Sequence, residues 1–321
     1  MVRRIRHRQL MLGLAVIIGL LSGVAATLLK NLTHFVELKS KSWLLGDHSS
    51  ELSYLLPLGG VMLTMLFVKY LLKQDIGHGV SKILFAISRR KGHLKAHNTW
   101  SSMLASSFTV GLGGSVGLEA PIVLTGSSIG SNIGHLLRLN YKSVVLLVGC
   151  GAAGAIAGIF KAPIAALIFV FEVLMLDLTT WSMVPLLLSS VTAAIVSYFL
   201  MGEQVVFAFT ISEPFAMENL PFYILLGIFT GLVSLYFTRM NQLVEHGMGK
   251  ISNGLVRTLT GGLLLSVLIY LMPHLFGEGY TTLHSLLTGT SADLFNGTII
   301  EGFIGENALL IVGAFLGLIM F

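Results

Sequence analysis

The stretch GLGGSVGLEAPIVLTGSSIGSNIG, Gly111 to Gly134, contains a single charged residue, Glu119. From Asn98 to Leu137 no other residue is Asp, Glu, Lys or Arg. An acidic residue at the middle of a membrane helix costs about 3 kcal/mol, and such residues usually mark ion or proton pathways. The stretch therefore predicts a carboxylate deep in a membrane with a part in transport. The alternative is a Glu that caps a helix at the bilayer surface.

The residues around Glu119 indicate the start of a helix. Glycines precede it and Pro121 follows it, and proline suits the first turn of a helix, where its missing N–H costs nothing. We expect helices to start at Pro121 and at Gly79. The free N–H groups of a helix start form an anion site. The Glu119 carboxylate is then a tethered anion that competes with a mobile one.

The composition predicts an all-α polytopic membrane protein without a large soluble domain. Hydrophobic residues make up 54% of the chain and charged residues 11%, whereas soluble domains have about 25% charged residues. A membrane span needs roughly 20 apolar residues. Uncharged runs near this length recur at 10–29, 52–68, 98–118, 120–137, 143–160, 178–202, 219–238 and 258–276.

The basic residues predict the orientation in the membrane. They cluster at 3–8, 89–95 and 239–257, at the ends of the apolar runs. The positive-inside rule places such clusters in the cytoplasm, so we expect a cytoplasmic N-terminus in the inner cell membrane. The net charge of +5 is explained by these clusters and does not indicate binding to nucleic acid.

An internal repeat divides the chain. Similar glycine patterns and Gly-x-Gly turns recur in the same order with offsets of 208, 202 and 200 residues, ending at Gly77-His78-Gly79 and Gly277-Glu278-Gly279. We predict a first membrane repeat at 1–202, an extracellular linker at 203–218 and a second repeat at 219–321. The counterpart of Glu119 would follow Ile319, so we expect the second repeat to be incomplete. Repeats with interrupted helices are typical of transporters that bind substrate at the midplane.

The sequence argues against an enzyme. The stretch before Glu119 does not have the G-x-G-x-x-G spacing, no phosphate-binding G-x-x-x-x-G-K-[ST] occurs, and no His/Cys cluster has metal spacing. We therefore expect no metal and no cofactor other than a bound ion. A cation site favours several carboxylates, and the apolar runs offer only Glu119 and Glu172, which leaves a transporter of another ion as a third alternative.

Three segments together resemble the CLC family of chloride channels and proton/chloride antiporters. They are GLEAP at 117–121, GCGAAGAIAGIFKAPIAALIFVFEV at 149–173 and DIGHGVSK at 75–82. The resemblance implies an inverted-repeat helical bundle, a homodimer in the lipid bilayer, chloride as the ligand and Glu119 as the gate. It places the anion site at Gly77, His78, Gly79, Val80, Gly117, Leu118, Ala120 and Pro121.

Two departures from the family pattern bear on function. His78 stands where the family has a serine that contacts the anion; either its ring donates to the anion or it turns away and backbone N–H groups bind. Val173 stands where the antiporters have their inner proton-transfer glutamate. This favours a passive chloride channel, with a proton-coupled antiporter as the alternative. Phe160 and Lys161 are possible pathway residues; alternatively Phe160 packs, and Lys161 reaches the surface, pairs with Glu172 or has a structural role.

Overall fold

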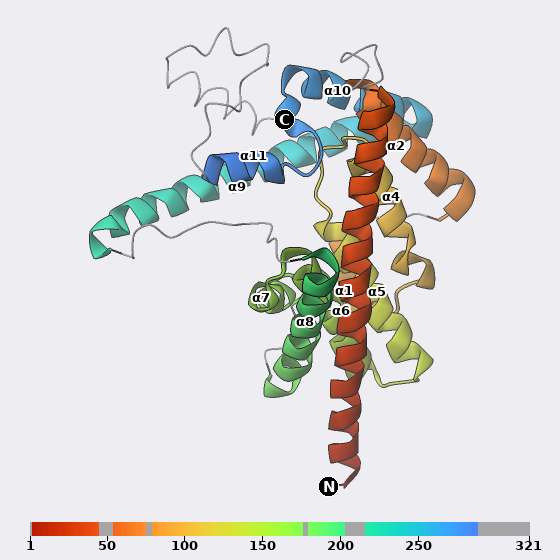
Figure 1. The fold of residues 1–321 in the computed structure, drawn as a ribbon, viewed down its shortest axis with the longest axis vertical. Coiled ribbons are helices and arrows are strands. Elements are labelled where there is room, and N and C mark those ends of the chain that lie inside the picture. Colours follow the sequence, from red (N-terminus) through yellow and green to blue (C-terminus); the bar gives the residue numbers. More distant parts are fainter. Residues whose placement is uncertain (1, 45–53, 75–78, 176–178, 203–215, 288–321) are drawn as a thin grey trace.

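The computed structural model describes residues 2–44, 54–74, 79–175, 179–202 and 216–287. Every regular element in these ranges is a helix, which confirms the all-α prediction (Figure 1). The elements are α1 Val2–Leu44, α2 Leu56–Leu66, η2 Phe67–Leu72, α3 Gly79–Arg89, η3 Ala96–Thr99, α4 Ser101–Gly111, α5 Glu119–Leu136, α6 Tyr141–Phe160, α7 Pro163–Val173, α8 Thr180–Met201, η4 Met217–Asn219, α9 Leu220–Gly249, α10 Gly254–Leu271, η5 Pro273–Leu275 and α11 Tyr280–Leu287.

Within the described residues, five helices are long and apolar enough to cross a membrane. They lie at 7–40, 141–160, 181–201, 217–249 and 254–271, which confirms a polytopic membrane protein. The length of the uncharged run at 98–118 suggested one spanning helix, but the structure does not have one there. The run contains η3 and α4 and then leaves the helix after Gly111, because the glycine-rich segment that follows disfavours helical backbone.

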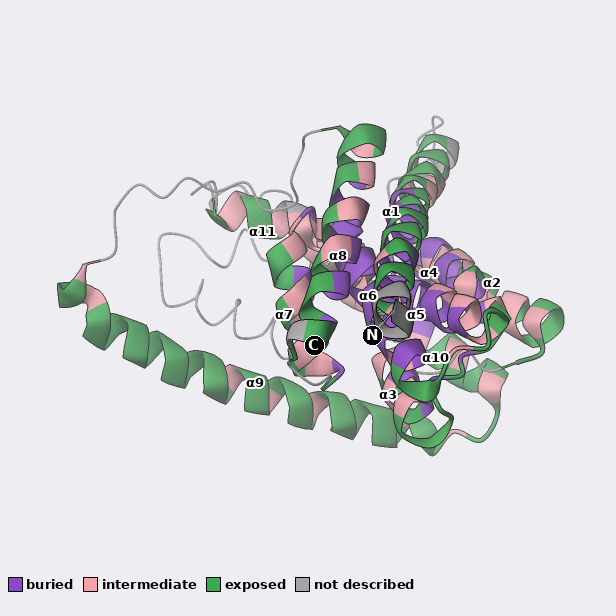
Figure 2. Ribbon diagram, turned by 90° about the horizontal axis from the view of Figure 1, so that it is seen from below, coloured by how far each residue is buried: buried purple, intermediate pink, exposed green. Residues whose placement is uncertain are grey.

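The core is built around α6. This helix packs against α1, α5 and α8, and nearly all its residues are buried (Figure 2). Small residues make this packing possible, because they let membrane helices approach closely. At the crossing of α5 and α6, a Cβ atom on Gly126 would overlap the carbonyl oxygen of Gly151, and the converse also holds.

Buried serines join the same helices. Ser189 of α8 donates to the carbonyl of Cys150 in α6 at 2.8 Å, and Ser197 donates to the carbonyl of Gly158 at 2.6 Å. Hydrogen bonds of this kind hold helices together where water is absent. Helices α1 and α5 to α8 therefore form one packed unit.

The second half of the described chain packs less closely. No residue of α9 is buried, and the helix extends away from the rest of the molecule in Figures 1 and 2. Helix α10 packs on α2, where a Cβ atom on Gly262 would lie 2.6 Å from Leu58 Cδ1. Within the described residues, each half has a long helix, a shorter helix and then a helix whose start, at Gly79 or Tyr280, ends or follows a Gly-x-Gly sequence. The division at 202 and 219 stays a prediction, and most of its linker, 203–215, lies outside the described residues.

Candidate anion site and gate

Glu119 is the first residue of α5. The helix starts two residues earlier than predicted from Pro121, because the turn at Leu118 already has helical backbone angles; Pro121 still lies in the first turn. Leu118 has no polar side chain with which to cap the helix, and the first N–H groups of a helix have no partner within it. This end of α5 therefore carries a partial positive charge, as expected for an anion site.

The Glu119 side chain folds back toward the start of its own helix. A Cβ atom on Gly117 would overlap Oε2 of Glu119, so the carboxylate lies against the loop that precedes α5. The side chain is partly buried, whereas Leu118 is 1% exposed. The carboxylate consequently occupies space beside the helix start, as a tethered anion must in order to compete with a mobile one.

Tyr280 contacts this carboxylate, and two other segments lie next to Tyr280 or to Ala120. The hydroxyl of Tyr280, the first residue of α11, donates a hydrogen bond to Glu119 Oε1. The ring of Phe160, at the end of α6, packs edge to face against Tyr280 with 6.3 Å between centroids. At the start of α3, a Cβ atom on Gly79 would lie 2.6 Å from the Ala120 carbonyl oxygen. The predicted residues Gly79, Ala120 and Phe160 therefore lie near Glu119 or its hydrogen-bond partner.

The loop between α4 and α5 holds the segment that carries Tyr280. Gly113 has a φ of +95°, which L side chains rarely adopt, and the ring of Phe276 covers it. The Gly277 N–H donates to the Gly113 carbonyl at 3.4 Å. A residue with a side chain at position 113 would be strained and would also displace Phe276. The glycines before Glu119 thus position a donor from the second half of the chain.

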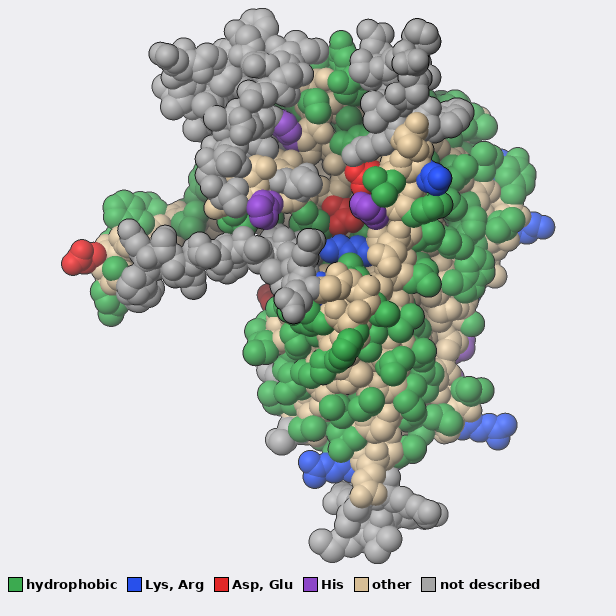
Figure 3. All heavy atoms as spheres, in the orientation of Figure 1, with side chains coloured by type: hydrophobic (Ala, Val, Ile, Leu, Met, Phe, Trp, Pro, Cys, Tyr) green, Lys and Arg blue, Asp and Glu red, His purple; other side chains and the backbone are tan. Residues whose placement is uncertain are grey.

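A cavity of about 700 Å³ opens beside this contact, and Figure 3 shows acidic, basic and histidine side chains gathered in a recess on a largely hydrophobic face. Burial raises the pKa of Glu278 above its usual value; the charge of Lys30 opposes this rise, and the charges of Glu119 and Glu37 add to it. The lining residues are Lys30, Thr33, His34, Glu37, Val110, Phe276, Gly277, Glu278, Gly279, Tyr280, His284 and Ser285.

The sequence model of the family described as voltage gated chloride channel matches residues 59–321. The chain belongs to the CLC family. A putative chloride channel protein ClcB-like from Ralstonia nicotianae is 30% identical over 73% of the chain and 56% of the relative. The H(+)/Cl(−) exchange transporter ClcA from Vibrio cholerae is 26% identical over 86% of the chain and 62% of the relative. The chloride channel protein CLC-e from Arabidopsis thaliana is 26% identical over 89% of the chain and 44% of the relative. The chain spans about half the length of these curated relatives.

Solved structures show the same CLC fold. A slow cyanobacterial Cl−/H+ antiporter has a TM-score of 0.75 at 21% identity, covering 97% of this chain and 72% of that one. A CLC-type fluoride/proton antiporter also has a TM-score of 0.75, at 24% identity, covering 88% and 70%. These likenesses confirm the predicted fold class, and membership of a family of ion-transport proteins agrees with the expectation that the chain is not an enzyme.

The Lys161 side chain makes contacts within the protein that connect two helices. Its side chain is only 8% exposed, which makes the surface alternative wrong. Its Nζ donates to the Gly202 carbonyl at 2.7 Å and lies 5.1 Å from the centre of the Tyr198 ring. The residue thus ties the turn between α6 and α7 to the end of α8. Glu172, the partner considered from the sequence, is exposed on α7.

The other predicted site residues divide into three groups. Val80 is partly buried and packs against the core, and Pro121 is partly buried in the first turn of α5. Val173 is the partly buried last residue of α7. Gly77 and His78 lie outside the described residues, so the role of His78 toward an anion stays a prediction.

Sequence reasoning missed Tyr280, Phe276 and Glu278. Their signal was available in the repeat, because Gly277-Glu278-Gly279 corresponds to the Gly-x-Gly turn that precedes α3. A turn predicted to bind anions in one half indicates that the residues after its counterpart also approach the pathway.

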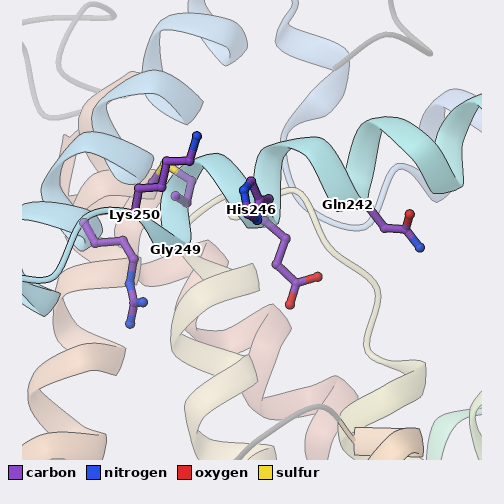
Figure 4. A pocket seen from close by; sticks show the side chains of 7 residues that line it. Gln242, His246, Gly249 and Lys250 are labelled. Atoms are coloured by element: carbon purple, nitrogen blue, oxygen red, sulfur yellow. The ribbon is translucent and has the colours of Figure 1, made fainter.

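A second cavity, of about 850 Å³, lies at the junction of α9 and α10. Its polar side chains include Gln242, His246, Lys250 and Arg257. In Figure 4 the side chains of Lys250 and Gln242 point in opposite directions, so the polar groups do not converge on one point. Among the described residues no group of three or more His, Cys, Asp or Glu could hold a metal ion.

Proposed function

We propose that this chain forms the gated anion pathway of a proton-coupled chloride exchanger. The observation that carries the proposal is the placement of Glu119: its carboxylate lies at the start of α5, folded against Gly117 and hydrogen-bonded to Tyr280. A carboxylate in this position blocks an anion when it is ionised and frees the site when it is protonated. One group then responds to both the anion and the proton.

The relatives support coupling to protons. Several relatives from Vibrio species, 25–26% identical over 86% of the chain, are named H(+)/Cl(−) exchange transporters. In the proposed cycle a chloride ion displaces the Glu119 carboxylate from the helix start. The carboxylate then takes a proton and releases it when it returns to Tyr280.

A passive chloride channel is the second candidate, and Val173 favours it. An apolar side chain at the end of α7 has no proton to accept or release, so the inner proton route of an exchanger would need another group. Glu172 is beside it and exposed, which makes it the first residue to test as that group.

The deciding experiment measures chloride efflux and proton uptake together, in liposomes that contain the chain. We expect proton movement in a fixed ratio to chloride, abolished in Glu119→Gln and Glu119→Ala while chloride flux continues. Glu218→Gln, an exposed carboxylate in η4, is the matched control and should behave as the wild type. Chloride flux without protons in the wild type would favour the channel. Equal flux in the wild type and both Glu119 variants would refute the gate.

The assembly and orientation belong to the same proposal. We place the chain in the inner cell membrane with its N-terminus in the cytoplasm, as the basic residues before α1 indicate. A homodimer is the expected assembly. Crosslinking in native membranes, read together with protease access to the N-terminus, tests both statements.

A further inference from the structure

Glu278 is an acidic residue with no part in the exchange cycle proposed for Glu119. It lies in the turn between η5 and α11, is partly buried, and lines the cavity of about 700 Å³ beside the gate. A partly buried lysine of α1, Lys30, lines the same cavity. A carboxyl group that is withdrawn from bulk water, yet reached through an open cavity, can exchange a proton with solvent near neutral pH.

Tyr280 connects this carboxyl group to the gate. It follows Glu278 by two residues, lines the same cavity, and donates its hydroxyl hydrogen to Glu119. The oxygen of a hydroxyl that donates one hydrogen bond can accept another, because it has two lone pairs. The cavity is large enough for water to bridge Glu278 and this hydroxyl. A proton therefore has a short route between the gating carboxylate and the cavity, through the tyrosine hydroxyl.

Opposing influences set the proton affinity of Glu278. Burial raises its pKa, the positive charge of Lys30 opposes this rise, and the negative charges of Glu119 and Glu37 add to it. A group that transfers protons works best when its pKa lies near the working pH, because it must both take and release the proton. Lys30 thus keeps Glu278 able to release its proton. The charged and titratable groups around it are Lys30, His34 and Glu37 on α1, Glu119 on α5, and Tyr280 and His284 on α11.

We propose that Glu278 carries protons between Glu119 and the cavity, through the hydroxyl of Tyr280. This inference rests on the proposed function, because it concerns the proton half of the exchange cycle. When the protonated Glu119 returns to Tyr280, it gives its proton to the tyrosine oxygen while the tyrosine hydroxyl gives its own hydrogen to the Glu278 carboxylate. Glu119 is left ionised, Tyr280 is unchanged, and Glu278 is neutral until it releases the proton to water in the cavity. The same steps run backward when the proton gradient is reversed.

The test measures coupled chloride efflux and proton uptake in liposomes that hold the chain in one orientation, over a range of pH on the side that the cavity faces. Glu278→Gln should slow both fluxes by about tenfold or more, since a positioned acid or base speeds proton transfer by roughly 10²- to 10⁴-fold. Glu278→Asp keeps a carboxyl group and should retain most of the rate. Glu37→Gln removes a carboxylate from the α1 side of the same cavity and, as the matched control, should keep the wild-type rate.

Chemical rescue and the pH profile separate proton transfer from a loss of structure. Imidazole added on the cavity side carries protons in place of a missing carboxyl group, because its pKa lies near neutrality. It should restore the rate of Glu278→Gln and leave that of Glu119→Gln unchanged. Lys30→Gln should shift the pH dependence of the rate to higher pH, because Glu278 then holds its proton more tightly. Lys39→Gln, at an exposed position on the same helix, should not shift it.

Three results would overturn the proposal. They are a Glu278→Gln variant with the wild-type rate and pH dependence, a slowed variant that imidazole does not restore, and a pH dependence that disappears when His34 and His284 are both changed to Gln. Each of these leaves the gate itself in place, because the gate is judged from the Glu119 variants. A wild-type chain that moves chloride without protons would instead refute the proposed exchanger, and this inference with it.

Discussion

Removing the hydroxyl of Tyr280 should open the gate. In the structure this hydroxyl donates to the Glu119 carboxylate, while the ring packs on Phe160. Tyr280→Phe keeps the ring and deletes only the hydrogen bond. A hydrogen bond to a charged group contributes about 1.5 to 3 kcal/mol, and the lower value applies because Glu119 is partly exposed. About 1.5 kcal/mol corresponds to a roughly tenfold shift toward the conformation in which the carboxylate has left the site.

The assay is the initial rate of chloride efflux from liposomes at pH 7.5. We expect Tyr280→Phe to raise the rate by up to about tenfold, and Tyr70→Phe, an exposed tyrosine on η2, to leave it unchanged. In a Glu119→Gln background the same change should have little effect, because the charged acceptor is already gone. Equal, additive effects of Tyr280→Phe in both backgrounds would refute the idea that the hydroxyl acts through the carboxylate.

Three further changes test other parts of the structure. Gly126→Ala should lower the midpoint of thermal unfolding, because its methyl group would overlap Gly151 and overpacking costs about 1 to 3 kcal/mol. The control Gly227→Ala on α9 places its methyl group in open space and should leave the midpoint unchanged. Equal midpoints in the two variants would contradict the close crossing of α5 and α6. Gly117→Ala should displace the gating carboxylate and raise chloride efflux; an unchanged rate would place the carboxylate elsewhere. Burial raises the pKa of Glu278, so the folded state binds this proton more tightly and loses stability as the pH rises through that pKa. Glu278→Gln should therefore stabilise the chain at pH 8 and not at pH 4. Thermal unfolding at both pH values measures this difference.

The sequence allowed the fold class and the helix start near Glu119 to be predicted because both depend on local patterns. Long uncharged runs indicated helices in a membrane, and a lone carboxylate before Pro121 indicated a helix start. The start itself was displaced by two residues, because backbone angles at Leu118 depend on packing rather than on the position of proline. The loss of helix after Gly111 was missed for a similar reason: an apolar run satisfies the hydropathy of a span whether or not its glycines allow one continuous helix.

Long-range contacts could not be read from the sequence in the same way. No local pattern predicts that Tyr280 will form a hydrogen bond with Glu119, or that Lys30 and Glu278 will line the same cavity. Lys161 shows the limit most clearly. Its spacing from Glu172 suggested an ion pair on one helix face, but the turn between α6 and α7 has left-handed backbone at Lys161, with a φ of 55°, and the side chain is directed to Gly202 instead.

The bond between Tyr280 and Glu119 joins residues 161 positions apart, and this has a consequence for how the protein is made. Helices α5 to α8 enter the membrane before the ribosome reaches residue 280. At about 5 to 20 residues per second, the carboxylate waits roughly 10 to 30 s for its hydroxyl partner. In this interval the nascent chain has the Glu119 carboxylate but not yet the hydroxyl that donates to it. Slow codons between the two residues would prolong this interval.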